Sequence, residues 1–229
     1  MIALEQARID ALRESERKAG VLFETAAGRG LIAAGATEQE VSDGVRDLAR
    51  ELFGIDRFWH KRIVRTGRNT LSPYRENPPD LTITDDDIVF VDFGPIFEEW
   101  EADFGRTYVV GDDPAKHRLA ADLSRLWEDG RRRFLEQEDV TGEQLYRYVL
   151  GRIAQAGWEH PETHAGHLVG EFPHERIEGD RRGSYITDGN TAPLRRTASS
   201  GRVCRWILEI HIVDRAGGFG GFVEQLLDI

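Results

Sequence analysis

The sequence predicts an α+β fold in which two similar halves place helices outside a shared antiparallel sheet. Three observations support this prediction. Two units of long helix, capped helix, glycine and strand follow one another, about 104 residues apart when measured between Thr37 and Thr141. Two Val-, Ile- and Phe-rich runs form a hairpin between these units. The 229 residues, 40% of them hydrophobic, suffice for one large core, so we expect a single domain spanning 1–229.

The first half begins with two helices. Residues 3–34 carry apolar side chains at the period of an amphipathic helix that covers a sheet. Thr37 and Glu40 form a capping box, which predicts a second helix that ends at Gly54. A β-prone run at 58–64 and a proline-containing loop follow, and they lead into the hairpin.

The hairpin spans residues 88–111 and carries an aspartate in each of its two apolar runs. A turn centred on Phe97 and Glu98 would set Asp92 directly opposite Asp103 on one face of the sheet. Two like charges about 5 Å apart in a dry place repel strongly unless a proton or a cation lies between them. The alternative is a pair of exposed hairpin acids.

The second half repeats the helical pattern of the first. Asp113 and Pro114 predict the start of a helix that runs through Phe134. Thr141 begins another capping box, and its helix ends at Gly157. We therefore expect the second half to resemble the first and to close against it.

Composition excludes several classes of protein. The net charge of −11 and pI of about 5.2 argue against binding to nucleic acid or to an anionic membrane. The single Cys204 excludes a disulfide framework and a thiolate metal cluster, and it fits a reducing compartment. The charged N-terminal stretch is no signal peptide, and no apolar run is long enough to cross a membrane. These features lead us to expect a soluble, cytoplasmic protein.

Carboxylates recur where apolar strands are predicted, at Asp92, Asp103, Glu209 and Glu224. A carboxylate is costly to bury unless it is paired or binds a metal ion. Four of the seven histidines lie between 160 and 174, although any one of them is more often a hydrogen-bonded structural residue. The four negative charges of these carboxylates would balance two divalent cations, and oxygen-rich ligands with one histidine and no thiolate suit Mn, Fe, Co or Zn. Two such ions activate water for the hydrolysis of an amide or ester.

These residues resemble the M24 metallopeptidases of the pita-bread fold, a family that includes methionine aminopeptidase, Xaa-Pro aminopeptidase, prolidase and creatinase. The resemblance rests on the order of five ligands and on two motifs, VDFGPIFEEWEADFGRTYVVG and GHLVGEFPHE. It covers essentially the whole chain, and the family's ligand set falls on Asp92, Asp103, His167, Glu209 and Glu224.

The resemblance implies a role for each residue. Asp92 would bind one ion, Asp103 and Glu224 would bridge both, and His167 with Glu209 would bind the other. His174 would contact the substrate and steady the tetrahedral intermediate, and Glu209 would also carry the proton. The cofactor would be two divalent ions, with manganese favoured. The short chain implies that the extra N-terminal domain of prolidase and creatinase is absent.

The sequence also departs from the family. The family has a substrate-binding histidine at a position that falls near Tyr74 in this sequence. A tyrosine can donate one hydrogen bond but cannot act as an imidazolium ion. His211 shares the strand face of Glu209, so it is either a further ligand, a substrate contact or a space-filling residue. Arginines in the insertion between His174 and Glu209 either form a solvated face or hold a substrate carboxylate; they are Arg176, Arg181, Arg182, Arg195, Arg196, Arg202 and Arg205.

Three functional hypotheses follow. The first is a dinuclear hydrolase that cleaves a small peptide or peptide-like amide near its N-terminus, most like an Xaa-Pro aminopeptidase. The second keeps the metals but acts on a non-peptide C–N bond, as creatinase does, and Tyr74 favours it. The third is a non-catalytic ligand-binding protein of the same fold, against which the intact ligand set argues. The expected partner is a small peptide or amide substrate, with or without a carboxylate. A homodimer is compatible with the sequence.

Overall fold

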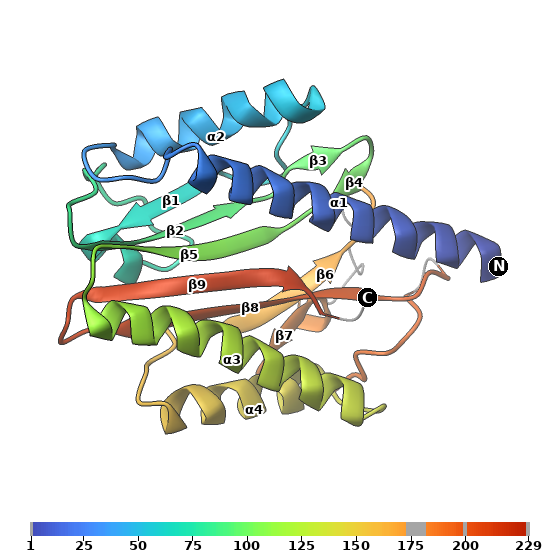
Figure 1. Ribbon diagram of the computed structural model, residues 1–229. Coiled ribbons are helices and arrows are strands. Elements are labelled where there is room, and N and C mark those ends of the chain that lie inside the picture. Colours follow the sequence, from blue (N-terminus) through green and yellow to red (C-terminus); the bar gives the residue numbers. More distant parts are fainter. Residues whose placement is uncertain (1, 173–181, 199–200, 228–229) are drawn as a thin grey trace.

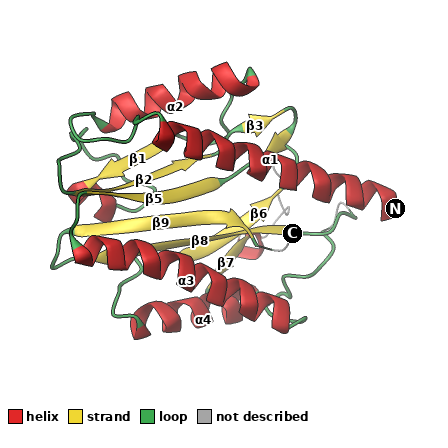
Figure 2. Ribbon diagram, viewed as in Figure 1, coloured by secondary structure: helices red, strands yellow, loops and turns green. Residues whose placement is uncertain are grey.

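The computed structural model describes residues 2–172, 182–198 and 201–227. Its centre is a seven-stranded antiparallel sheet in the order β1-β2-β5-β9-β8-β6-β7 (Figures 1 and 2). Strands of the first half form one side of the sheet and strands of the second half form the other. Among the described residues, no helix is long and apolar enough to cross a membrane.

The first half contains two helices that lie beside its strands (Figure 1). The threonine capping box is present, and the second helix ends at Gly54, whose φ of 69° is left-handed. Its elements are α1 (Ile2–Gly28), α2 (Glu38–Phe53), β1 (Ile63–Thr66), the 3₁₀ turn η1 (Gly67–Leu71), β2 (Asp87–Phe93), the short strands β3 (Ile96–Phe97) and β4 (Trp100–Glu101), and β5 (Phe104–Val110).

The second half repeats this order of helix, capped helix and strand. Asp113 accepts the cap hydrogen bond of the first helix, and the capping box of Thr141 and Gln144 begins the second. Its elements are α3 (Pro114–Glu136), α4 (Gly142–Gln155), β6 (His164–Val169), the 3₁₀ turn η2 (Arg182–Ser184), β7 (Tyr185–Thr187), β8 (Arg205–Asp214) and β9 (Phe219–Leu226). The predicted duplication of elements is therefore present in the fold.

Each half has its own hydrophobic core. In the first, Phe23 of α1 and Val45 of α2 pack against Phe93 of β2. In the second, Leu123 of α3 and Val149 of α4 pack beneath β8 and β9. Burial of these helix faces against the sheet drives the arrangement, because each helix is polar on its other side.

The two halves meet where β5 lies beside β9. Gly105 and Glu224 are the only β5–β9 residue pair in regular register within the described chain. Elsewhere along this seam a side chain replaces the backbone ladder: the Thr107 hydroxyl donates to the Phe222 carbonyl oxygen and accepts from the Phe222 N–H, both at 2.8 Å. The seam is thus held in part by side chains.

Three sequence-based expectations need correction. The first helix was expected to run to residue 34, but it ends at Gly28, and Gly30 follows with a left-handed φ of 71°. The β-prone run at 58–64 contributes a strand only from Ile63, and it extends to Thr66. The hairpin register also differs, because Phe97 pairs with Trp100 and the turn is centred on Glu98 and Glu99.

This shift in the turn changes the partner of Asp92. Asp92 lies opposite Gly105, so the prediction that it directly faces Asp103 is wrong by two residues. A displacement of two keeps Asp103 on the same side of the chain as Gly105, since side chains alternate with a period of two. The two aspartates are therefore diagonal neighbours, and both are buried.

Candidate metal centre

Three of the predicted acids lie in one row that crosses the sheet. The register places Asp92 opposite Gly105, Gly105 opposite Glu224, and Glu224 opposite Glu209. Residues directly opposite one another project from the same face. The row runs through β2, β5, β9 and β8, so both halves of the fold contribute. A methyl group at Gly105 would lie 2.5 Å from the Phe222 ring, so close packing requires glycine there.

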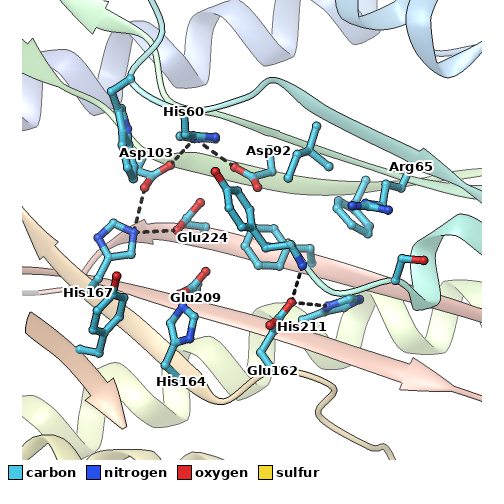
Figure 3. Close-up of a pocket in the computed structure, with 17 residues that line it drawn as sticks. His60, Arg65, Asp92, Asp103, Glu162, His164, His167, Glu209, His211 and Glu224 are labelled. Carbon is cyan, nitrogen blue, oxygen red and sulfur yellow. Dashed lines mark hydrogen bonds and ion pairs between the residues drawn. The ribbon is translucent and has the colours of Figure 1, made fainter. Parts of the chain in front are cut away.

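Asp103 and His167 complete the predicted ligand set at this row (Figure 3). His167 Nε2 lies 3.0 Å from Asp103 Oδ2 and 3.7 Å from Glu224 Oε1. Asp103 and Glu224 are 3% and 2% exposed. All five residues that the sequence assigned to metal binding thus line a single cavity.

A second imidazole, which sequence reasoning did not assign to the site, belongs to His60. Its Nε2 lies 3.1 Å from Asp103 Oδ1 and 3.5 Å from Asp92 Oδ1. The ring occupies the space between the two aspartates (Figure 3). Asp103 therefore has an imidazole at each of its carboxylate oxygens, one from each half of the fold.

His164 is a further imidazole of the site and pairs with Glu209. Its Nε2 lies 2.9 Å from Glu209 Oε1. Burial acts to raise the pKa of Glu209, but the neighbouring His164 outweighs it and holds the pKa below its ordinary value. Glu209 is therefore an ionised carboxylate that can accept a proton.

The other carboxylates of the site differ in the direction of their pKa shifts. Burial raises the pKa of Asp92, and burial together with repulsion from Asp103 raises the pKa of Glu224 well above its ordinary value. Burial opposes ionisation of Asp103 as well, but His60 and His167 reverse the effect and lower its pKa. Burial acts to lower the pKa of His60, yet Asp92 and Asp103 raise it to about 9. Without metal ions, the negative charge of the buried carboxylates is thus compensated by bound protons and by imidazolium ions.

The donor set fits two divalent metal ions. Two groups of ligand atoms each lie within 4.8 Å of one another: His60 with Asp92 and Asp103, and Asp103 with His167 and Glu224. Asp103 belongs to both, as a bridging carboxylate would. Among the described residues the buried Asp92 Oδ1 accepts no hydrogen bond, which is costly unless a cation binds it. Carboxylate and imidazole ligands without thiolates suit Mn, Fe, Co or Zn.

The residues line a cavity of about 270 Å³. The carboxylates and His60, His164 and His167 lie toward one end, whereas Arg65, Glu162 and His211 lie toward the other (Figure 3). Arg65 is 3% exposed, and its Nη2 donates a hydrogen bond of 2.7 Å to the Glu76 carbonyl oxygen. Its Nε and Nη1 make no hydrogen bond to any residue that the structure describes. The guanidinium of Arg65 thus lines the cavity beyond the candidate metal ligands.

Tyr74 and His211, the predicted substrate contacts within the described chain, both line this cavity. The ring centroid of Tyr74 lies 6.0 Å from that of His60. His211 Nε2 donates 2.7 Å to the Thr70 carbonyl oxygen, and its Nδ1 lies 3.9 Å from Glu162 Oε1. His211 therefore faces Glu162 rather than the four carboxylates of the predicted ligand set. His174 lies outside the described residues.

The described arginines of the insertion do not line the cavity. Arg195 donates to the Gln137 carbonyl oxygen, and Arg202 pairs with Glu171 at 3.2 Å. Arg205 pairs with Glu5 at 2.6 Å, and Arg196 donates to the Pro193 carbonyl oxygen. For these side chains the solvated or structural interpretation is favoured, as it is for Arg182, which is exposed; Arg176 and Arg181 lie outside the described residues.

One signal in the sequence could have identified His60. It stands 23 residues after the capping Thr37, and His164 stands 23 residues after the capping Thr141. The internal duplication therefore places an imidazole at the same point of each half. Spacing from Asp92 gives no such indication, because His60 precedes it by 32 residues and lies in the loop between α2 and β1.

Comparisons with known proteins agree with this geometry. The family model "Metallopeptidase family M24" matches residues 10–206. Among solved structures, the prolidase of Thermococcus sibiricus is 23% identical, with a TM-score of 0.77 over 97% of this chain and 57% of that one. The X-Pro aminopeptidase of Thermotoga maritima is 21% identical, with a TM-score of 0.76 over 96% and 57%.

A third similar structure is the Xaa-Pro dipeptidase of Bacillus anthracis, which is 21% identical, with a TM-score of 0.76 over 95% of this chain and 56% of that one. The chain thus spans little more than half the length of these proteins. At this level of identity the likeness establishes the fold. No curated protein shows a significant sequence match.

Proposed function

Because the chain belongs to metallopeptidase family M24, we propose that it is a dinuclear metal-dependent hydrolase that cleaves a small peptide or peptide-like amide near its N-terminus, as an Xaa-Pro aminopeptidase does. Its fold is the pita-bread α+β fold of that family. The observation that carries the proposal is the convergence of five ligand side chains from both halves on one cavity; they are Asp92, Asp103, His167, Glu209 and Glu224.

These five side chains would hold the two ions, which when bound supply an activated water and polarise the scissile carbonyl. The chain itself supplies the proton carrier: Glu209, kept ionised by His164, can accept a proton and pass it to the departing amine. Burial raises the pKa of Tyr74 to about 12, so its phenol stays protonated and can donate a hydrogen bond to the substrate. His174 keeps the role that the family resemblance implies.

The cavity supports a small substrate. Its volume of about 270 Å³ lies just below the range of drug-sized ligand pockets, which begins at about 300 Å³. Arg65 at the far end supplies the positive charge that a substrate carboxylate would need. A dipeptide with a free C-terminus combines an amide with such a carboxylate, and an Xaa-Pro dipeptide is therefore the preferred probe.

The test is release of free amino acid from a panel of Xaa-Pro dipeptides by protein loaded with Mn or Co. Glu209→Gln should reduce kcat about 10²- to 10⁴-fold, since it removes the proton carrier. Glu159→Gln is the matched control, because Glu159 is exposed and pairs with Arg215 at the surface, away from the cavity. Metal-loaded protein that releases no amino acid from any member of the panel would refute the peptidase proposal.

One observation favours a second candidate. Tyr74 stands near the position of the family's substrate-binding histidine, so a creatinase-like hydrolase of a non-peptide C–N bond remains the alternative. Bound metal with turnover of such an amide, but not of peptides, would select it. Protein that binds no metal would instead support a non-catalytic ligand-binding role.

The remaining expectations belong to the same proposal. Residues 1–229 act as one catalytic domain, manganese is the first ion to test, and a homodimer is allowed for. The buried Cys204, the single cysteine of the chain, and the net charge of −11 suit a cytoplasmic protein that binds neither membranes nor nucleic acid.

A further inference from the structure

We propose that His60 is a sixth protein ligand of the metal centre, so that each of the two ions binds one imidazole. The ligand set implied by the family resemblance has only His167. The inference rests on the metal-binding part of the proposed function and is independent of the substrate.

The first argument is the symmetry of contacts around Asp103. His60 Nε2 lies 3.1 Å from Oδ1, and His167 Nε2 lies 3.0 Å from Oδ2. A carboxylate that bridges two ions presents one oxygen to each, so each imidazole lies on the side of a different ion. The second partner of His60 is Asp92, whereas that of His167 is Glu224.

The second argument is the orientation of the ring. His60 Nδ1 lies 2.7 Å from the carbonyl oxygen of Lys61, and His167 Nδ1 lies 2.8 Å from that of Leu168. A carbonyl oxygen only accepts, so in both residues Nδ1 carries the proton. With Nδ1 protonated, Nε2 is the atom that would bind a metal ion: it donates to the carboxylates while it carries a proton, and loss of that proton frees its lone pair for an ion held by the same carboxylates. Metal-binding histidines are usually oriented in this way by a carbonyl or carboxylate behind them.

The third argument is that the backbone holds His60 in place. The Trp59 N–H donates 2.9 Å to the Gly94 carbonyl oxygen, and the Ile96 N–H donates 3.0 Å to the Arg57 carbonyl oxygen. These two hydrogen bonds hold residues 57–59 against the chain just after β2, where Gly94 lies two residues beyond Asp92. Gly94 makes the approach feasible, because a Cβ there would lie 2.4 Å from His60 Cδ2. The side chain of His60 is 5% exposed.

A sixth ligand changes the preferred metal. Oxygen-rich sites suit manganese, whereas imidazole nitrogen favours Zn, Fe and related ions. One nitrogen for each ion makes the two positions more alike and shifts the preference toward Co or Zn relative to a centre with a single histidine.

The test is cobalt binding to metal-free wild type and two variants, measured by calorimetry and by metal analysis after desalting. His60→Gln should lower the affinity for one of the two cobalt ions at least about tenfold, since loss of even an outer partner of a metal ligand costs that much affinity. His211→Gln is the matched control: His211 is equally buried in the same cavity, but it faces Glu162. Two ions bound to His60→Gln with wild-type affinity would overturn the proposal.

A measurement on wild type decides the matter if His60→Gln does not fold. Proton NMR of the cobalt-loaded protein shows strongly shifted, exchangeable imidazole N–H signals from bound histidines, because Nδ1 keeps its proton. We expect two such signals, and a single signal would contradict the assignment. Neither readout involves turnover, so an inactive protein with two bound imidazoles would refute the proposed substrate and leave the ligand assignment intact.

Discussion

Substitution of Gly94 by alanine tests the packing that brings His60 to the metal centre. A Cβ at Gly94 would lie 2.2 Å from Trp59 Nε1 and 2.4 Å from His60 Cδ2, whereas ordinary contacts begin at 3.4 Å. At least one ångström of movement is therefore required of both rings. A shift of this size breaks the 3.1 Å contact between His60 and Asp103. Overpacking of this kind costs about 1–3 kcal/mol.

The assay is thermal unfolding with and without cobalt. We expect Gly94→Ala to lower the Tm of the metal-free protein by roughly 2–12 °C, from about 2–4 °C for each kcal/mol at this chain length. It should also weaken cobalt binding. Gly151→Ala is the control, because Gly151 is exposed in α4 and a Cβ there meets nothing within 4 Å. Wild-type stability and cobalt affinity in Gly94→Ala would refute the reasoning.

Two further predictions concern metal removal and pH. EDTA should lower the Tm by roughly 5–10 °C, because ligand at a hundredfold excess over its Kd contributes about 2.7 kcal/mol; calorimetry checks this, and an unchanged Tm would contradict metal binding. Burial raises the pKa of Glu16 to about 7. The folded state therefore binds this proton more tightly, and its contribution to stability is complete below pH 4.5 and lost as the pH rises to 7. Glu16→Gln should thus gain about 2–3 kcal/mol on wild type between pH 5 and pH 8 in urea unfolding, and a constant difference would disprove the role of Glu16.

The fold could be predicted because its signals are local. The capping boxes at Thr37 and Thr141 and the left-handed Gly54 fix helix ends through hydrogen bonds that span only a few residues. The duplication then indicated two halves, and the pita-bread fold implied by the family resemblance is confirmed. The end of the first helix was missed because residues 29–34 keep the apolar period of a helix although the chain turns at Gly30.

The site could be predicted only where residues stand out from their surroundings. Acids within apolar strands, such as Asp92 and Glu224, conflict with burial and attracted attention for that reason. His60 could not be found in this way, because a histidine beside Trp59 in a polar segment is unremarkable. Its role depends on a close approach to Gly94 from a distant part of the chain. Register was likewise missed, since the left-handed φ of 59° at Glu98 moves the turn by one residue.

Because candidate ligands lie on both sides of the seam between β5 and β9, bound ions would stabilise the fold in addition to their role in the reaction. Asp103 belongs to one half and Glu224 to the other, and only a thin backbone ladder joins the two strands. Ions bound by carboxylates of both halves would cross-link the two halves of the fold. A chain without its ions would therefore be weakest along this line, where Gly105–Glu224 is the only β5–β9 pair in regular register among the described residues and the Thr107–Phe222 hydrogen bonds add to it.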